Sequence, residues 1–283
     1  NVRAGITVVV AKPGTYVPGT KVTIGVGKIR GVESFGMMCS ERELELSEEH
    51  EGIMELTSGD VGDNFVDWLA SNDPGKVDTV IDIAITPNRP DALGIRGIAR
   101  DLAARGLGFL KPQKNHVIEE SFPCPILVSI DEDTLKQCPV FYGRMIRGVR
   151  NGPSPDWLQN RLKSIGLRPI SSLVDVTNFF TYDNNRPLHV FDAQKIAGRV
   201  LRVHRAKGGE HFHALDEKTY VLSEGMTIIS DSNGVESLGG IIGGIQSACS
   251  PETVNVFLEA AFFDPVTTAY TGRDLKINSD ARY

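Results

Sequence analysis

The 283-residue chain has 41% hydrophobic and 23% charged residues and a formal net charge of −6. This composition is that of an ordinary globular protein, long enough for two domains or one large one. No apolar run reaches the roughly 18–20 residues that a membrane helix needs, and no basic and then apolar leader opens the chain, so we expect a soluble, cytoplasmic protein without membrane contact.

The net charge and the cysteine spacing limit which partners and which kinds of site the chain is expected to have. The negative net charge is only a weak argument against a nucleic acid, because a local basic face is enough to bind a large RNA. The four cysteines are widely spaced, without a Cys-x-x-Cys pair, which predicts reduced, mostly buried thiols and not a metal or redox site. Because the chain begins at Asn1 and ends at Tyr283 without a closing turn, we interpret it as a fragment.

Residues 1–70 read as a β-rich module. Proline and glycine turn signals separate short predicted strands, and a short helical stretch follows at 65–69. The strands are expected at residues 6–11, 21–29 and 52–56. Three strands do not close a barrel, whereas an oligonucleotide-binding (OB) barrel has five. We therefore expect a partial OB-type barrel whose missing strands precede Asn1.

Residues 71–121 form a predicted connecting segment. A strand is expected at 79–85, followed by a helix that Asn88 caps and that has Pro90 in its first turn, where a missing N–H costs nothing. Apolar residues at helical spacing continue to Leu102. The stretch 111–123, with two prolines among mixed polar residues, predicts a linker.

From residue 122 onward the pattern is α+β. Helices are expected at 155–165 and 171–180, the first anchored by Trp157, Leu158, Leu162 and Ile165. Strands are expected at residues 126–130, 140–149, 199–205, 220–222, 226–230 and 253–258. Because helices cluster early and strands late, without βαβ alternation, a doubly wound sheet is excluded.

Two motifs resemble ligand-binding motifs, but the residues adjacent to them in the sequence do not support that interpretation. Gly239–Gly244 resembles a phosphate loop, but Ile245 and Gln246 follow where Lys-Ser/Thr would be needed. A glycine-lined turn that a ligand or a neighbouring backbone approaches closely is therefore favoured. His211 and His213, with His204 upstream, could share a strand face. No third ligand type accompanies them, which favours a solvated hairpin over a metal site.

Charged side chains give two further hypotheses. Basic residues could line an RNA path or form a solvated face; they are Lys28, Arg30, Arg144, Arg147, Arg150, Arg161, Lys163 and Arg168. Lys28 and Arg30 are expected to alternate on a strand. Asp175 and Glu259 each stand in an apolar run, where a carboxylate is costly unless it is paired or hydrogen-bonded. Each is therefore a candidate for a functional site or for a structural pair.

Four segments have a distinctive order and spacing: Lys28–Ser40, Ile85–Gly94, Val174–Phe179 with Arg186–Asp192, and Gly239–Gly244 with Phe257–Phe263. In this order they resemble the β subunit of bacterial phenylalanyl-tRNA synthetase over essentially the whole chain. The first segment is similar to the tRNA-binding OB module of synthetase-associated proteins. The second resembles a segment specific to the β subunit, and the last two are similar to its B3/B4 editing domain.

The resemblance implies an α+β multidomain fold with an OB-type module at 1–70, a small α/β connecting segment at 71–121 and an α+β B3/B4 editing domain at 122–283. It implies a cytoplasmic (αβ)₂ tetramer that joins phenylalanine to tRNA(Phe) with ATP and Mg²⁺. The ligase site belongs to the α subunit, and no cofactor is expected in this fragment. The β-subunit part is expected to bind tRNA(Phe) and to hydrolyse mischarged Tyr-tRNA(Phe).

The resemblance also assigns roles to individual residues. Glu259 would accept a hydrogen bond from the tyrosine hydroxyl. Gly243 and Ala281 would leave space for the ring. His189 and Arg168 would lie near the ester and the tRNA 3′ end. A positioned water would attack the ester, with His189 as an optional general base. Ser279 stands where the family usually has threonine, and Arg282 stands where it usually has a small polar residue. Both differences alter the predicted pocket.

Two other classes of function stay open beside the editing hydrolase. One is a tRNA-binding or interaction module that has lost catalysis, and the other is an unrelated α+β enzyme. The presence of His189, Gly243 and Glu259 together favours the hydrolase.

Overall fold

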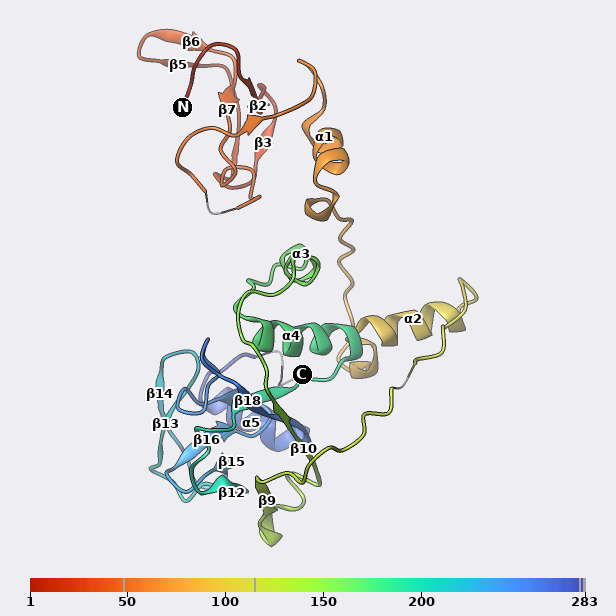
Figure 1. The fold of residues 1–283 in the computed structure, drawn as a ribbon, viewed down its shortest axis with the longest axis vertical. Coiled ribbons are helices and arrows are strands. Elements are labelled where there is room, and N and C mark those ends of the chain that lie inside the picture. Colours follow the sequence, from red (N-terminus) through yellow and green to blue (C-terminus); the bar gives the residue numbers. More distant parts are fainter. Residues whose placement is uncertain (48, 115, 280, 282–283) are drawn as a thin grey trace. The chain divides into compact units, whose positions relative to one another are not determined.

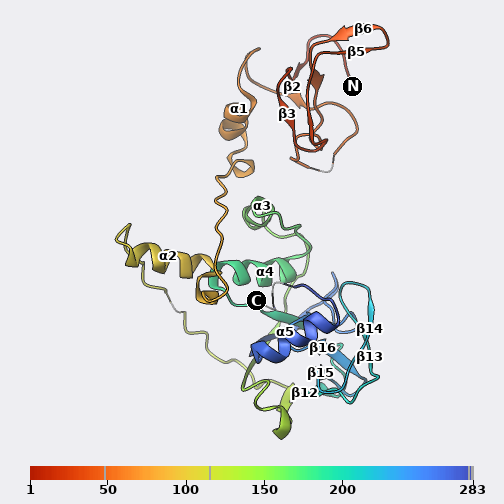
Figure 2. The same ribbon diagram turned by 180° about the vertical axis from the view of Figure 1, so that it is seen from behind.

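The computed structural model describes residues 1–47, 49–114, 116–279 and 281. They divide into two compact units, residues 1–80 and 81–283, each drawn with its own strands and helices in Figures 1 and 2. The expected α+β multidomain class is confirmed, while the three-part division at residues 70/71 and 121/122 stays a prediction. None of the helices in the described parts of the chain is long and apolar enough to span a membrane.

The first unit consists of four two-stranded antiparallel ladders. They pair β1 (Thr7–Val8) with β8 (Glu55–Leu56), β2 (Val10–Ala11) with β7 (Met37–Met38), β3 (Tyr16–Val17) with β4 (Val22–Thr23), and β5 (Gly27–Ile29) with β6 (Val32–Ser34). Ala11, Val17 and Cys39 form a small core. The ladders do not join into a closed barrel within the described residues.

Short helical elements close the first unit. The Asn64 side chain accepts hydrogen bonds from the backbone N–H groups of Val66 and Asp67 and so starts α1 (Phe65–Asn72). A 3₁₀ turn, η1 (Pro74–Lys76), follows. The predicted helical stretch at 65–69 is thus confirmed and is longer than expected.

The predicted strand at 79–85 is wrong, because these residues form neither helix nor strand. Val80 and Ile81 are 59% and 75% exposed, so the apolar run finds no sheet to join. The helix that follows, α2 (Ile95–Ala104), begins after Gly94 and not at Asn88. Pro90 instead starts a separate 3₁₀ turn, η2 (Pro90–Ala92).

The second unit contains two sheets of three or more strands. A three-stranded antiparallel sheet has the order β10 (Val140–Arg147), β18 (Asn255–Phe262) and β11 (His189–Asp192). A five-stranded sheet has the order β17 (Ile242–Gly243), β16 (Val235–Leu238), β15 (Thr227–Ser230), β12 (Val200–Arg205) and β9 (Leu127–Ile130). Only the β9–β12 pair is parallel among these ladders.

The two sheets share one apolar core. Phe191 and Phe257 of the three-stranded sheet cluster with Leu201, Val203 and Ile229 of the five-stranded sheet. A second cluster, around Phe212 and Leu238, lies under the hairpin of β13 (His211–His213) and β14 (Thr219–Val221). Residues on one face of each sheet are therefore buried against the other, and this arrangement places β11, β18 and the β16–β17 hairpin near one another.

Helices α3 (Asp156–Ser164) and α4 (Ser172–Asn184) confirm the two predicted amphipathic helices, and α5 (Pro265–Asp274) follows β18. Leu158 and Leu162 are buried as expected. Trp157 and Ile165 are 58% and 47% exposed and do not anchor the helix. Trp157 instead contacts Phe179 edge-on. Two 3₁₀ turns, η3 (Glu132–Thr134) and η4 (Ala197–Arg199), complete the elements of this unit.

Candidate functional site

A cavity of about 510 Å³ in the second unit brings together four of the residues singled out in the sequence. They are His189, Gly243, Glu259 and Ala281, which come from four separate segments of the chain. The remaining walls are mostly apolar, with Leu188, Leu215, Leu238, Ile241, Phe262 and Phe263 among the lining residues. A mostly apolar cavity with a few polar groups is typical of a small-ligand site.

Glu259 is the buried acidic group of this cavity. It lies on the central strand β18, opposite Gly143 on one side and His189 on the other. Its side chain is 6% exposed, and Oε2 is buried without a hydrogen-bond partner among the described residues. Burial raises the pKa of Glu259 to about 8. At neutral pH the group is therefore a neutral carboxylic acid, which offers both a donor and an acceptor.

His189 is the second polar group that the cavity leaves unsatisfied. Its Nε2 is buried without a hydrogen-bond partner in the described structure, and its ring packs edge-on against Phe191 with the centroids 4.3 Å apart. Burial lowers the pKa of His189 to about 4, so the imidazole is neutral at pH 7. Because opposite residues of an antiparallel pair project to the same side, His189 and Glu259 form an uncharged pair at neutral pH.

Gly243 lies against the imidazole. A Cβ atom at this position would be 2.2 Å from Cε1 of His189, so any larger residue requires the imidazole to move. At Gly239 a Cβ atom would be 2.6 Å from Cε1 of Phe263. The glycines of this turn do permit close approaches, but at Gly239 and Gly243 the groups that approach are ring side chains. A neighbouring backbone approaches at Gly244, where a Cβ atom would be 2.8 Å from the carbonyl oxygen of Glu236.

The C-terminal segment reaches the same cavity. Ala281 lines it, whereas Ser279 does not. The Ser279 hydroxyl instead donates a hydrogen bond of 2.7 Å to the carbonyl oxygen of Ile241, which ties this segment to the glycine turn. Arg282 lies outside the described residues.

The basic residues predicted to contact RNA lie outside the cavity lining. Arg168 is exposed in the loop between α3 and α4. Lys28 is on β5, but Arg30 lies in the turn before β6 with φ 51°, so the predicted alternation on a strand is wrong. On β10, Arg144 and Arg147 are three residues apart and project to opposite faces, and Arg147 stacks on Phe122 at 3.9 Å.

The Asp175 side chain is buried and hydrogen-bonded, as expected for a residue with a structural role. The carboxylate is fully buried and accepts hydrogen bonds from the Ser154 hydroxyl (2.5 Å) and the Ile170 backbone N–H (2.8 Å). These bonds join the segment before α3 to the turn before α4. Of the two carboxylates that the sequence singled out, only Glu259 lines the cavity.

The histidine group does not converge on a metal position. His204 Nε2 pairs with the Ser230 hydroxyl and His213 Nδ1 with the Thr219 hydroxyl, each at 3.0 Å. Among the described residues no group of three potential His, Cys, Asp or Glu ligands is close enough to hold a metal ion. His211 and His213 lie on the β13–β14 hairpin, as the hairpin interpretation predicts.

Pro90, Asn185 and Arg186 are among the lining residues that were not proposed as site residues from the sequence. Pro90 and Arg186 belong to distinctive segments of the sequence, but nothing in either pattern shows that the two segments meet. Asn185 carries one local signal, since asparagine is among the residues that tolerate the left-handed conformation at a helix end.

Comparison with known proteins gives the chain a family context. Residues 137–283 match the B3/4 domain family. The whole chain is 67% identical to a part of the phenylalanine–tRNA ligase β subunit of Ruegeria pomeroyi, 58% identical to that of Cereibacter sphaeroides and 51% identical to that of Bradyrhizobium diazoefficiens. It covers 35%, 35% and 34% of these proteins, so the chain spans about a third of the length of the relatives it matches.

A solved structure is also similar at a low level. It is an N-terminal fragment of the phenylalanyl-tRNA synthetase β subunit from Pyrococcus horikoshii, 18% identical, with a TM-score of 0.40 over 75% of this chain and 68% of that one.

Proposed function

Because the chain belongs to the B3/4 domain family and matches bacterial phenylalanine–tRNA ligase β subunits along its whole length, we propose that its second unit hydrolyses Tyr-tRNA(Phe). The observation that carries this proposal is Glu259, a buried carboxyl group without a hydrogen-bond partner among the described residues, in the lining of a largely apolar cavity. An apolar cavity suits the ring of an aromatic amino acid, and the carboxyl group suits its hydroxyl.

The chemistry of discrimination explains why such a site would be useful. A synthetic pocket shaped for the phenylalanine ring rejects an added hydroxyl poorly, so a second, hydrolytic site is needed for accuracy. In that second site the tyrosine hydroxyl pairs with Glu259. Phenylalanine leaves the carboxyl group desolvated and unpaired, at a cost of about 1–3 kcal/mol, which favours the tyrosyl ester by about 5- to 150-fold.

The hydrolysis needs a water molecule and no protein nucleophile. The water oxygen bonds to the ester carbonyl carbon, the bond to the ribose oxygen breaks, and the ribose oxygen takes up a proton. The products are tyrosine and a tRNA with a free terminal hydroxyl. Neutral His189, with its unpaired Nε2, can accept a hydrogen bond from this water. Its pKa of about 4 makes it a weak base, so its main role is to orient the water.

The remaining properties of the whole protein belong to the same proposal. We place the chain in a cytoplasmic (αβ)₂ ligase, with ATP, Mg²⁺ and aminoacylation at the α subunit's site. Exposed Lys28 and Arg30 of the first unit, together with Arg168, would contact tRNA phosphates.

The test compares hydrolysis of Tyr-tRNA(Phe) and Phe-tRNA(Phe) by the chain and by Glu259→Ala. We expect the variant to lose about 5- to 150-fold of its activity on the tyrosyl ester, as the pairing energy above implies, while it keeps a cooperative melting transition. Glu236→Ala is the matched control, since Glu236 is also buried, with 1% exposure, but does not line the cavity.

Two results would contradict the proposal. A collapsed melting transition in Glu259→Ala would show a structural role for the carboxyl group. Failure of the unaltered chain to hydrolyse either ester, with tRNA binding retained, would favour a binding module that has lost catalysis.

A further inference from the structure

One side of the cavity is built from two segments that are far apart in the sequence. Pro90 comes from η2, while Asn185 and Arg186 follow the end of α4, and all three line the cavity. Pro90 lies well before residues 137–283, which match the B3/4 domain. Part of the wall is therefore supplied by chain outside the family match.

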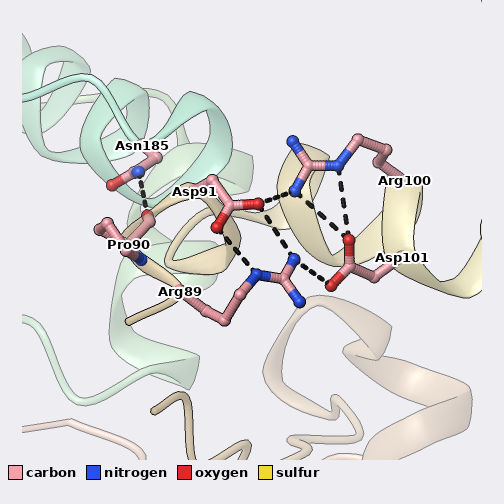
Figure 3. Close-up of polar contacts among 6 residues, drawn as sticks. All are labelled: Arg89, Pro90, Asp91, Arg100, Asp101 and Asn185. Carbon is pink, nitrogen blue, oxygen red and sulfur yellow. Dashed lines mark hydrogen bonds and ion pairs between the residues drawn. The ribbon is translucent and has the colours of Figure 1, made fainter. Parts of the chain in front are cut away.

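A single side chain joins these two segments. Asn185 ends α4 in the left-handed conformation, with φ 52°, and its Nδ2 donates a hydrogen bond of 2.5 Å to the carbonyl oxygen of Pro90 (Figure 3). The contact is close, because a Cβ atom on Gly94 would be 2.5 Å from the backbone nitrogen of Asn185. Only glycine at position 94 lets the start of α2 approach the end of α4 in this way.

An ion-pair network holds the Pro90 turn from its other side (Figure 3). Arg89 contacts Asp91 at 2.9 Å and Asp101 at 2.5 Å, and Arg100 contacts both aspartates. Isolated exposed pairs contribute little, but a network that joins the turn to α2 restricts the turn. The guanidinium of Arg89 lowers the pKa of Asp91 to about 2, so the network is intact across the physiological range.

The charges in this network are balanced. Two arginines face two aspartates, so the four side chains carry no excess positive charge for an RNA phosphate. These four side chains instead restrict the position of Pro90, so that its carbonyl oxygen stays within hydrogen-bond distance of Asn185. We call them the brace.

We propose that residues 89–101 are a working part of the site and that Asn185 is a positioning residue, which sets the cavity wall at 185–188 through the Pro90 carbonyl. The ligand served by this wall is the aminoacyl ester at an RNA 3′ end, so the inference rests on the proposed function. His189 is held separately by its pairing with Glu259 in the sheet. Loss of the tether should therefore weaken ligand binding more than it slows the chemical step.

Asn185→Gly tests this role in the full 283-residue chain. Glycine keeps the left-handed backbone and removes only the side chain that donates to Pro90. Glu217→Gly is the matched control, since Glu217 also has a positive φ (64°) but lies in the β13–β14 turn and does not line the cavity. We expect the KM for Tyr-tRNA(Phe) to rise about five-fold, the factor for one ordinary hydrogen bond, with kcat changed less than about two-fold.

Amide hydrogen exchange provides a readout that does not depend on activity. In Asn185→Gly, exchange should become faster at residues 91–93 and at Arg186 and Leu188, and stay unchanged in β12 and β15. Unchanged exchange in the wall, or faster exchange with unaltered KM, would overturn the positioning role. If the unaltered chain hydrolyses no ester, the proposed function fails, and the exchange still decides whether Asn185 orders this wall.

Arg89→Gln tests whether the brace acts through the same contact. It removes the contacts to Asp91 and Asp101, and it should raise KM in the same direction as Asn185→Gly. In the double variant the KM should rise no more than in the more affected single variant, because both changes release one wall. Multiplicative effects of the two changes on KM would show independent roles and overturn the proposal.

Discussion

Two buried carboxyl groups of the second unit have nearly the same sequence signature and opposite environments. Asp175, in Leu173-Val174-Asp175-Val176, accepts two hydrogen bonds, one on each oxygen. Glu259, in Phe257-Leu258-Glu259-Ala260, leaves Oε2 unpaired within the described residues and lines a cavity. The difference shows that an acid in an apolar run marks burial, while its partners decide whether it stabilises the fold or remains available to a ligand.

The largest expected effect is on the stability contributed by Asp175. Asp175→Ala leaves the buried Ser154 hydroxyl and the part-buried Ile170 N–H without their acceptor, so we expect a loss of about 3–5 kcal/mol in the free energy of unfolding. Thermal or urea denaturation measures this loss. Asp175→Asn, which keeps an acceptor oxygen, should lose less. If Asp175→Ala were as stable as the parent, Asp175 would not have the structural role that distinguishes it from Glu259.

The next effect is the pH dependence of stability at Glu259. Its pKa is raised from 4.5 to about 8, so the native state binds more protons than the unfolded state between these values. The contribution of Glu259 to stability is complete below pH 4.5 and is lost as the pH rises through about 8. Between pH 5 and 8.5 the free energy of unfolding of Glu259→Gln should therefore rise by about 2–3 kcal/mol relative to that of the parent.

The His189 contribution has the opposite sign and does not obscure this test. Its pKa is lowered from 6.5 to about 4, so its contribution to stability is lost as the pH falls through that window. Both chains keep His189, and the difference between their denaturation curves cancels it. A constant difference between parent and Glu259→Gln from pH 5 to 8.5 would show that Glu259 is not held protonated.

A smaller effect is expected from the glycine beside the imidazole. Gly243→Ala places a methyl group against His189, and overpacking of this kind costs about 1–3 kcal/mol. Since the imidazole must move, hydrolysis of Tyr-tRNA(Phe) should fall about 10-fold, as measured under single turnover. Gly152→Ala is the control, because a Cβ atom there meets nothing within 4 Å. Equal activity of the two variants would remove His189 from the proposed reaction.

The smallest effect separates the cavity from RNA contacts elsewhere. Lys28→Ala in the first unit should weaken tRNA(Phe) binding for the tyrosyl and phenylalanyl esters equally, and reduce the slope of log affinity against log salt by about 1. Lys207→Ala, at another exposed lysine, should leave the slope unchanged. A change in the preference between the two esters would place Lys28 within the discriminating site.

The sequence by itself determined the elements whose pattern is local. Helical spacing of Leu158 and Leu162 predicted α3, and the β-rich character of residues 1–70 and the hairpin at His211–His213 were also predicted correctly. These features depend on periodicity and turn chemistry within a few residues. The same local pattern failed at 79–85, where an apolar run has no neighbouring strand, and at Arg30, which turns the chain instead of extending it.

Only the tertiary structure decided what the candidate residues do. It placed His189, Gly243, Glu259 and Ala281 around one cavity, whereas Ser279 and Arg168 do not line it. Whether a buried carboxyl group is hydrogen-bonded depends on donors from other segments, such as Ser154 and Ile170 for Asp175. The wall at Pro90 and Asn185 likewise depends on a contact across 95 residues of sequence. Such partners are chosen when the sheets and helices pack, so no local pattern contains them.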